Sequence, residues 1–152
     1  MHIEVSCILG KINRAYFGEK DAQQLAIIKR IVRDLNINVE VIGCPIIRDE
    51  DGVAKSSRNT YLSDEERIAA RVLNESLRHA KEVIQLGERD NAKVIDVITE
   101  VISKEPLAKV DYAEVVDLMS MDKVSEINKS VLVAIAVFIG KTRLIDNFIV
   151  EI

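Results

Sequence analysis

The sequence predicts an α/β protein in which a pair of parallel strands is followed by an α+β region with a small antiparallel sheet. Three observations support this prediction. Residues 14–44 read as extended, helical and extended again, within a length typical of a strand–helix–strand unit. Residues 63–103 carry apolar residues at helical spacing. Residues 110–150 contain three runs rich in β-branched residues, which are typical of strands.

The first unit begins with a short extended run at residues 14–17 that ends at Gly18. Asp21 is a good helix N-cap, and Gln24 three residues later completes a capping-box pattern. An apolar stripe at 3-4-3 spacing follows and predicts one face of a helix. Residues 39–44 (VEVIGC) then predict a second strand. A unit of this length favours a parallel pair with a right-handed crossover.

The pattern changes after the turn predicted at residues 49–52 (DEDG). Ser63 and Glu66 form a second capping box, which opens one long helix that runs up to Gly87. A shorter helix is predicted over residues 91–103. Three strands follow over residues 110–116, 131–138 and 142–150, and Gly140-Lys141 predicts a hairpin turn between the last two.

Composition argues against several classes of protein. The net charge of −4 argues against a nucleic-acid partner, because nucleic-acid-binding proteins usually carry a basic surface. The longest apolar run, residues 131–139, is too short to span a bilayer, so no membrane partner is expected. The first residues lack the pattern of a secretory signal, and only two cysteines occur. We therefore expect a cytoplasmic protein.

The stretch FGEKD at residues 17–21 is the first candidate site. Gly18 allows a ligand to approach the backbone closely, and the helix that begins near Asp21 offers free N–H groups to an anion. Lys20 adds a mobile charge suited to phosphate. The alternative is purely structural: Gly18 makes a turn, Asp21 caps a helix and Lys20 is solvated.

The second candidate is KSSRN at residues 55–59, where Lys55 and Arg58 flank two hydroxyl groups. Arg58 can grip phosphate oxygens in a bidentate manner, and Ser56 and Ser57 can donate hydrogen bonds. The alternative is a polar surface loop that leads to the next helix. Because both stretches follow the end of a strand in the predicted parallel pair, we expect them to meet at one edge of the sheet.

Four stretches in order along the chain resemble the pantothenate synthetase (pantoate–β-alanine ligase) family. They are FGEKDAQQ at 17–24, GCPIIRDEDGVAKSSRNTYLS at 43–63, VDYAEVVD at 110–117 and GKTRLIDN at 140–147. The resemblance implies a partial Rossmann-like nucleotidyltransferase sheet followed by an α+β domain. Residues 1–48 would be the remnant of the nucleotide-binding domain, and residues 49–152 would form a carboxy-terminal lid domain.

The resemblance also implies a reaction in two steps, with ATP as co-substrate and Mg²⁺ accompanying it. Pantoate would attack the α-phosphate of ATP to give pantoyl adenylate and pyrophosphate. The amine of β-alanine would then displace AMP and form pantothenate. No side chain needs to act as a covalent nucleophile, so the protein must orient its substrates and spread the charge on the phosphates.

Residue roles follow from the family motifs. By resemblance, Gly18, Lys20 and Asp21 would contact the nucleotide, with Asp21 on the ribose. Gln24 would hydrogen-bond pantoate. The backbone and apolar contacts of the adenine pocket would come from Pro45 and Ile47.

The KSSRN stretch would stand in for the family's mobile phosphate-binding loop, so Lys55, Ser56, Ser57 and Arg58 are expected to contact ATP. Lys20, Ser56, Ser57 and Arg58 are the residues expected to assist catalysis, because they can stabilise charge on the phosphates. Lys55 departs from the family, which commonly has methionine or leucine at that position.

One departure is larger. The family begins with a half that carries an HxGH signature, whereas His2 is followed here by Ile-Glu-Val, so the chain is expected to be a carboxy-terminal portion. The first hypothesis is therefore an ATP-dependent ligase. The alternatives are a non-catalytic nucleotide-binding or interaction module, and a structural piece without a ligand. The family resemblance also makes a homodimer possible.

Overall fold

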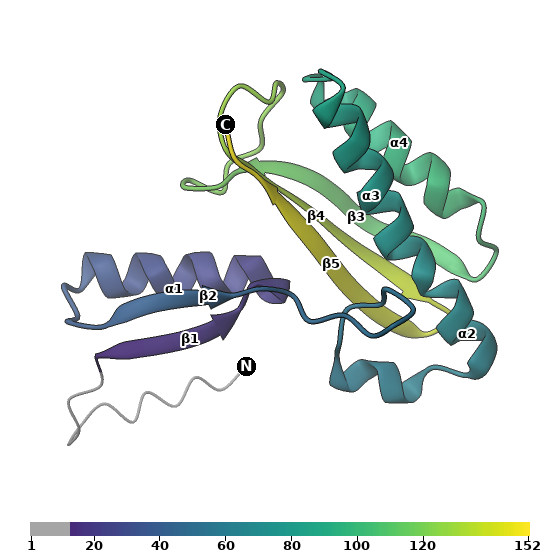
Figure 1. Ribbon diagram of the computed structural model, residues 1–152, viewed down its shortest axis with the longest axis horizontal. Coiled ribbons are helices and arrows are strands. Elements are labelled where there is room, and N and C mark those ends of the chain that lie inside the picture. Colours follow the sequence, from purple (N-terminus) through teal and green to yellow (C-terminus); the bar gives the residue numbers. More distant parts are fainter. Residues whose placement is uncertain (1–12) are drawn as a thin grey trace.

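The computed structural model describes residues 13–152, which form two separate sheets with four α-helices (Figure 1). The part of the predicted 1–48 unit that precedes Asn13, including His2, lies outside the described residues. No helix in the described range is both long and apolar enough to cross a membrane. The predicted division at residue 48 stays a prediction.

The first sheet is the predicted parallel pair. Strands β1 (Arg14–Gly18) and β2 (Glu40–Cys44) pair in parallel, and helix α1 (Ala22–Asp34) connects them. A short 3₁₀ turn that the sequence pattern did not indicate, η1 (Glu19–Asp21), lies between β1 and α1. The predicted cap is present, because the Asp21 carboxylate accepts a hydrogen bond of 3.1 Å from the backbone N–H of Gln24.

The second sheet is antiparallel in the order β3–β4–β5, and helices precede it in the chain. Each of its three strands was predicted within two residues at either end. The hairpin turn at Gly140 has a positive φ of 55°, a conformation that favours glycine. The elements are η2 (Ser57–Tyr61), α2 (Asp64–Ala69), α3 (Arg71–Gln85), α4 (Asn91–Ser103), β3 (Ala108–Asp117), β4 (Val131–Ile139) and β5 (Thr142–Val150).

The prediction of one long helix from Ser63 to Gly87 was wrong, because the helix is interrupted at Ala70. There the N–H of Leu73 bonds to the carbonyl of Ala70 at 3.3 Å, an i→i+3 contact that tightens the turn. Apolar spacing does not detect such a break, since Ala70 is itself buried and keeps the helical rhythm. The predicted Ser63–Glu66 capping box is confirmed.

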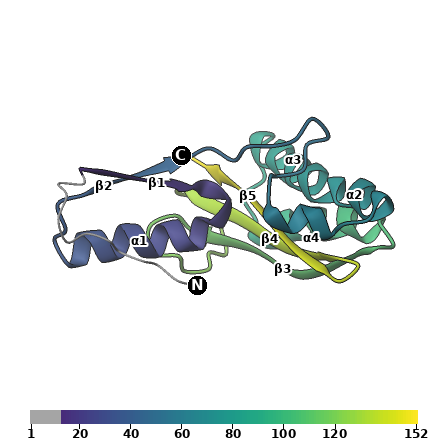
Figure 2. The same ribbon diagram turned by 90° about the horizontal axis from the view of Figure 1, so that it is seen from below.

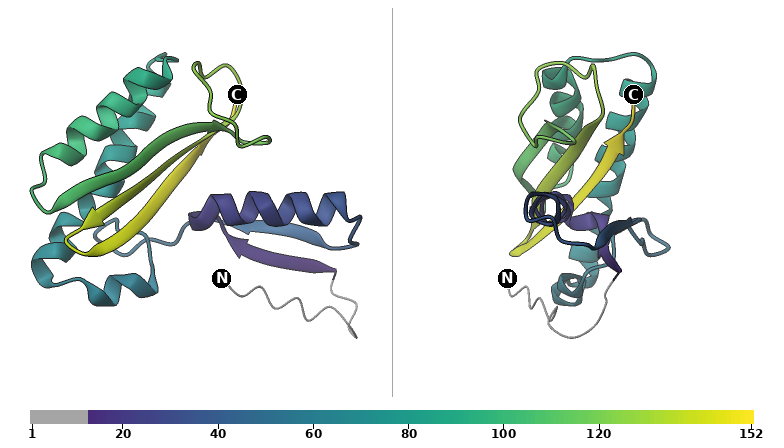
Figure 3. Two further views of the ribbon diagram at one scale, coloured as in Figure 1. Left: turned by 180° about the vertical axis from the view of Figure 1, so that it is seen from behind. Right: turned by 90° about the vertical axis from the view of Figure 1, so that its left-hand side faces the viewer.

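The main hydrophobic core lies between α3, α4 and one face of the antiparallel sheet (Figure 3). The alternate residues of β4 from Val131 to Ile139 face this core, and all of them are fully buried. The opposite face of the same sheet meets the η1 turn and the start of α1 (Figure 2). One face of the sheet therefore packs in the hydrophobic core, and its other face borders a cavity.

Candidate functional site

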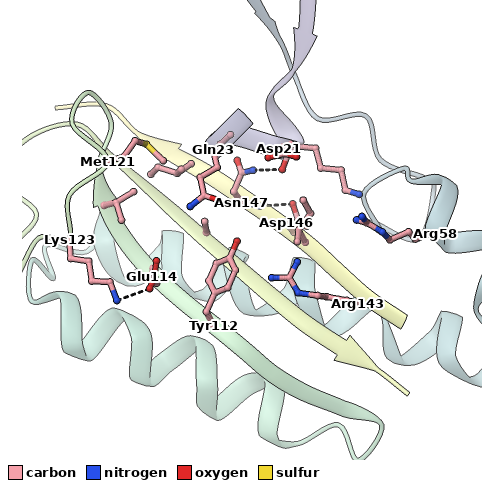
Figure 4. Close-up of a pocket in the computed structure, with 16 residues that line it drawn as sticks. Asp21, Gln23, Arg58, Tyr112, Glu114, Met121, Lys123, Arg143, Asp146 and Asn147 are labelled. Carbon is pink, nitrogen blue, oxygen red and sulfur yellow. Dashed lines mark hydrogen bonds and ion pairs between the residues drawn. The ribbon is translucent and has the colours of Figure 1, made fainter. Parts of the chain in front are cut away.

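A cavity of about 250 Å³ lies on the face of the antiparallel sheet that α3 and α4 leave open (Figure 4). Its floor comes from β3, β4 and β5, and the register places Glu114, Ala134 and Asn147 side by side on this face. Its wall comes from η1 and the first residues of α1, and Arg58 approaches it from the η2 segment. The cavity is thus enclosed by the antiparallel sheet, by the turn between β1 and α1, and by the segment that carries Arg58.

Lys20 enters the cavity because η1 turns the chain immediately after β1. Burial lowers the pKa of the Lys20 ammonium, the nearby Asp146 carboxylate opposes that effect, and the Arg58 guanidinium adds to it. Within residues 13–152, neither Lys20 nor Arg58 makes an ion pair. Two cations that share a cavity without an ion-pair partner are suited to a polyanion.

The segment from Ser56 to Tyr61 explains how Arg58 is presented. Ser56 is the N-cap of η2, and its hydroxyl accepts a 3.3 Å hydrogen bond from the backbone N–H of Arg58. The carbonyl of Ser57 accepts a hydrogen bond from Thr60, which closes the turn. The predicted loop is therefore a short 3₁₀ helix that displays Arg58. The hydroxyl groups of Ser56 and Ser57 do not line the cavity.

Lys55 lies apart from Lys20 and Arg58. Its ammonium is 3.5 Å from the Asp49 carboxylate, and both border a separate surface depression with Asp51 and Arg67. The sequence has no carboxylate between residues 53 and 60. The turn at residues 49–52 nevertheless folds the chain back on itself, so the Asp49 carboxylate lies beside Lys55. Four predicted residues thus separate, with Arg58 on the cavity, Lys55 in another depression, and Ser56 and Ser57 between them.

Of the remaining predicted site residues, Asp21 lines the cavity, whereas Gly18, Gln24, Pro45 and Ile47 do not. A side chain at Gly18 would meet nothing within 4 Å, and its φ of −68° is ordinary, so the fold of the described residues does not require glycine there. Pro45 is exposed, and Ile47 is 67% exposed. Asp21 lines the cavity, and it is Gln23, not Gln24, that joins it there. Gln24 is half-buried.

Sequence reasoning missed the polar groups of the antiparallel sheet. Asp146 forms a bidentate ion pair with Arg48, at 2.7 and 3.0 Å, and its side chain is only 2% exposed. Tyr112 rises from β3 with the Arg143 guanidinium 5.7 Å from its ring centre, a cation–π contact. Both Asp146 and Tyr112 fall inside the VDYAEVVD and GKTRLIDN stretches. Consecutive acidic and amide residues inside a strand were the available signal, because strands disfavour them.

The described residues do not form a metal cage. No group of three potential ligand side chains occurs among residues 13–152. Of the carboxylates that line the cavity, Glu114 pairs with Lys123 at 2.7 Å, Asp146 pairs with Arg48, and Asp21 caps α1. Each of these three carboxylates therefore already has a partner among the described residues.

Comparison with known proteins agrees with this architecture. The pantoate–β-alanine ligase family model matches residues 8–149. The pantothenate synthetase of Enterococcus faecalis is 67% identical over 140 residues, which cover 92% of this chain and 50% of the relative. That of Clostridioides difficile is 61% identical over 140 residues, with the same coverage of both chains. The chain therefore spans about half the length of the curated relatives it matches.

Solved structures give the same result. The pantothenate synthetase of Thermus thermophilus superposes with a TM-score of 0.84 at 40% identity, over 90% of this chain and 49% of that one. The pantoate–β-alanine ligase of Francisella tularensis, solved in complex with beta-gamma ATP and β-alanine, gives a TM-score of 0.59 at 32% identity, over 90% of this chain and 43% of that one. The chain belongs to the pantoate–β-alanine ligase family.

Proposed function

We propose that this chain binds the phosphates of ATP and contributes to the condensation of pantoate with β-alanine. The observation that carries the proposal is the meeting of Lys20 and Arg58, from separate segments, at one cavity. Neither cation has an ion-pair partner in the described part of the chain. A polyphosphate would bind both cations, and the complex of the Francisella tularensis ligase with beta-gamma ATP supports this choice of ligand.

In the proposed reaction, the carboxylate of pantoate attacks the α-phosphate of ATP, which releases pyrophosphate and leaves pantoyl adenylate. The amine of β-alanine then displaces AMP. Lys20 and Arg58 would stabilise negative charge on the phosphates, and Ser56 and Ser57 would donate hydrogen bonds after a small movement of η2. Gly18 would let the phosphates approach the backbone, because the space beside it is open.

Mg²⁺ would reach the site bound to the phosphates and would neutralise part of their charge. Asp21 would hold the ribose, Gln24 would hydrogen-bond pantoate, and Pro45 and Ile47 would contact adenine. Ile47 is exposed enough to do so. Lys55 would contact ATP only after leaving Asp49. A cytoplasmic location and a homodimer belong to the same proposal.

A second candidate is nucleotide binding without catalysis. The observation that favours it is that the cavity offers cations and hydrogen-bond donors for phosphate, whereas His79, the one histidine within residues 13–152, lies on α3 beside a different depression. The two functions differ in one measurable property, since only the ligase releases pyrophosphate in a pantoate-dependent manner.

The decisive experiment measures pyrophosphate release and thermal stabilisation with the same preparation. A ligase releases pyrophosphate only when ATP, Mg²⁺ and pantoate are all present, whereas a binding module shows a rise in Tm with Mg-ATP alone. Lys20→Ala should remove about 3 kcal/mol of transition-state stabilisation, a loss of roughly two orders of magnitude in rate. Lys81→Ala, on the exposed face of α3, is the matched control. Absence of both signals would exclude both functions for this chain.

A further inference from the structure

Asn147 makes a contact that links the antiparallel sheet to the turn that follows β1. Its side-chain Nδ2 donates to the backbone carbonyls of Glu19 and Lys20, each at 2.9 Å. These carbonyls belong to η1, the turn that carries Lys20 into the cavity, whereas Asn147 lies on β5, near the other end of the chain. One side chain therefore ties the candidate phosphate-binding turn to the antiparallel sheet.

The chemistry of this contact is specific to a carboxamide. A neutral –NH₂ group has two hydrogens, and each can serve one of the two consecutive carbonyls. A lysine or arginine at position 147 would place another cation beside Lys20, and a carboxylate would face two carbonyl oxygens without a hydrogen to donate. Asn147 is 4% exposed, so water does not readily replace the contact.

The neighbouring residue, Asp146, fixes the position of the β5 backbone at Asn147. Asp146 binds Arg48 through both carboxylate oxygens, and its Oδ1 also accepts the backbone N–H of Asn147 at 2.8 Å. Arg48 in turn donates to the carbonyl of Gly52. The backbone that carries the Asn147 side chain is therefore held by a partly buried ion pair, which is the support that a residue needs if it is to orient another group.

We propose that Asn147 is a positioning residue that holds the Glu19–Lys20 turn so that the Lys20 ammonium faces the cavity beside Arg58. The proposal rests on the proposed function only in taking the cavity ligand to be a polyphosphate. It makes the antiparallel sheet an active part of the site, since without Asn147 the turn has lost its two side-chain hydrogen bonds from that sheet.

The first test follows Lys20 itself, in the absence of any ligand. The pH dependence of amine acylation at each lysine is measured by mass spectrometry in the unmodified chain and in Asn147→Ala. Because burial lowers the pKa of Lys20, release of the turn should shift its titration midpoint upward, toward that of an ordinary lysine. The exposed Lys81 is the internal reference and should not change.

Two further variants separate positioning from general loss of stability. Asn147→Ser keeps a polar group in the buried strand but cannot reach two carbonyls, so it should shift Lys20 in the same direction. Asn91→Ala removes another carboxamide that donates to a backbone carbonyl, that of Val124, outside the Lys20 turn. It should lower stability without moving the titration midpoint of Lys20.

The second test is a double-variant cycle on Mg-ATP affinity. Asn147→Ala should weaken binding by roughly tenfold, and adding it to Lys20→Ala should cause little further loss, because Asn147 acts through Lys20. Losses that multiply, or a Lys20 midpoint that stays fixed in both Asn147 variants, would overturn the proposal. If the unmodified chain binds no triphosphate, the proposed function fails, while the acylation experiment still decides whether Asn147 positions Lys20.

Discussion

The two sheets of this chain differ in how completely their own helices cover them. In the antiparallel sheet, alternate residues of β4 are fully buried under α3 and α4, and α3 alone buries six residues. In the parallel pair, no residue of β1 or β2 is buried, and α1 buries only Leu25 and Ile28. Apolar side chains stay in solvent there, including Tyr16, Ile31 and Leu35.

This difference teaches where the stability of the molecule resides. Parallel sheets normally have both faces covered, and a pair of strands is marginal by itself in water. Asn147 and the Arg48–Asp146 ion pair tie the segments that follow β1 and β2 to β5, and we expect these contacts to stabilise the parallel pair. The candidate site lies where these contacts are made. The weakly covered unit, which is the parallel pair with α1, carries Lys20 in the turn after β1. The packed unit, which is the antiparallel sheet with its helices, holds that turn through Asn147.

The largest expected effect tests the packed unit. Ile98→Ala on α4 removes a fully buried side chain from the main core, and it should lower the free energy of unfolding by about 2 to 5 kcal/mol. Ile31→Ala on α1 is the matched control, because that side chain is 43% exposed and should cost less than about 1 kcal/mol. Urea denaturation measures both. Equal losses would show that the two helices contribute alike.

A smaller effect concerns acid stability. The Asp117 carboxylate binds the Lys129 ammonium at 2.7 Å and accepts backbone N–H bonds from Ser120 and Met119, which hold its pKa well below the usual range. Arg33 lowers the pKa of Asp34 on α1 in the same direction, but that pair is largely exposed. Asp117 lies on β3 of the antiparallel sheet and Asp34 lies on α1 beside the parallel pair, so comparing the two carboxylates compares the two regions.

For a carboxyl whose folded pKa is depressed, the unfolded chain binds the proton first as the pH falls. The stability that Asp117 supplies is thus complete above its unfolded pKa, near 4, and is lost as the pH falls toward its folded pKa. Asp117→Asn should lower stability at pH 7 and flatten the decline below about pH 5, as acid titration followed by circular dichroism would measure. Asp34→Asn should leave the curve nearly unchanged, and a similar flattening in both variants would contradict the assignment.

Much of this fold followed from local patterns. The parallel pair, the cap at Asp21, helix α4 and the three antiparallel strands were all predicted, because apolar periodicity and caps are local signals. The interruption at Ala70 and the η1 turn were not, since both depend on backbone hydrogen bonds that leave the hydrophobic pattern unchanged.

The site was only partly predictable for a related reason. Lys20 and Arg58 were expected to meet, and both line the same cavity. Lys55 was expected with them, but it lies beside Asp49, because a tight turn folds that acidic residue back. The roles of Asp146 and Asn147 depend on the register of β5 against β4 and on contacts with Arg48 and the η1 turn. These partners lie far away in the sequence, so the residue pattern of β5 alone does not predict them.

The smallest expected change in stability tests the open face of α1. Replacing Ile27 and Ile31 together with glutamine keeps good helix formers at two half-exposed positions, so the free energy of unfolding should change by less than about 1 kcal/mol. If the uncovered face drives association between copies of the chain, the same change should abolish the concentration dependence of the sedimentation coefficient. Ile68→Gln, an exposed position on α2 in the packed unit, should leave association unaltered. If association survives the double replacement, the copies meet through the antiparallel sheet and its helices. The difference in how the two sheets are covered would then affect folding and not association.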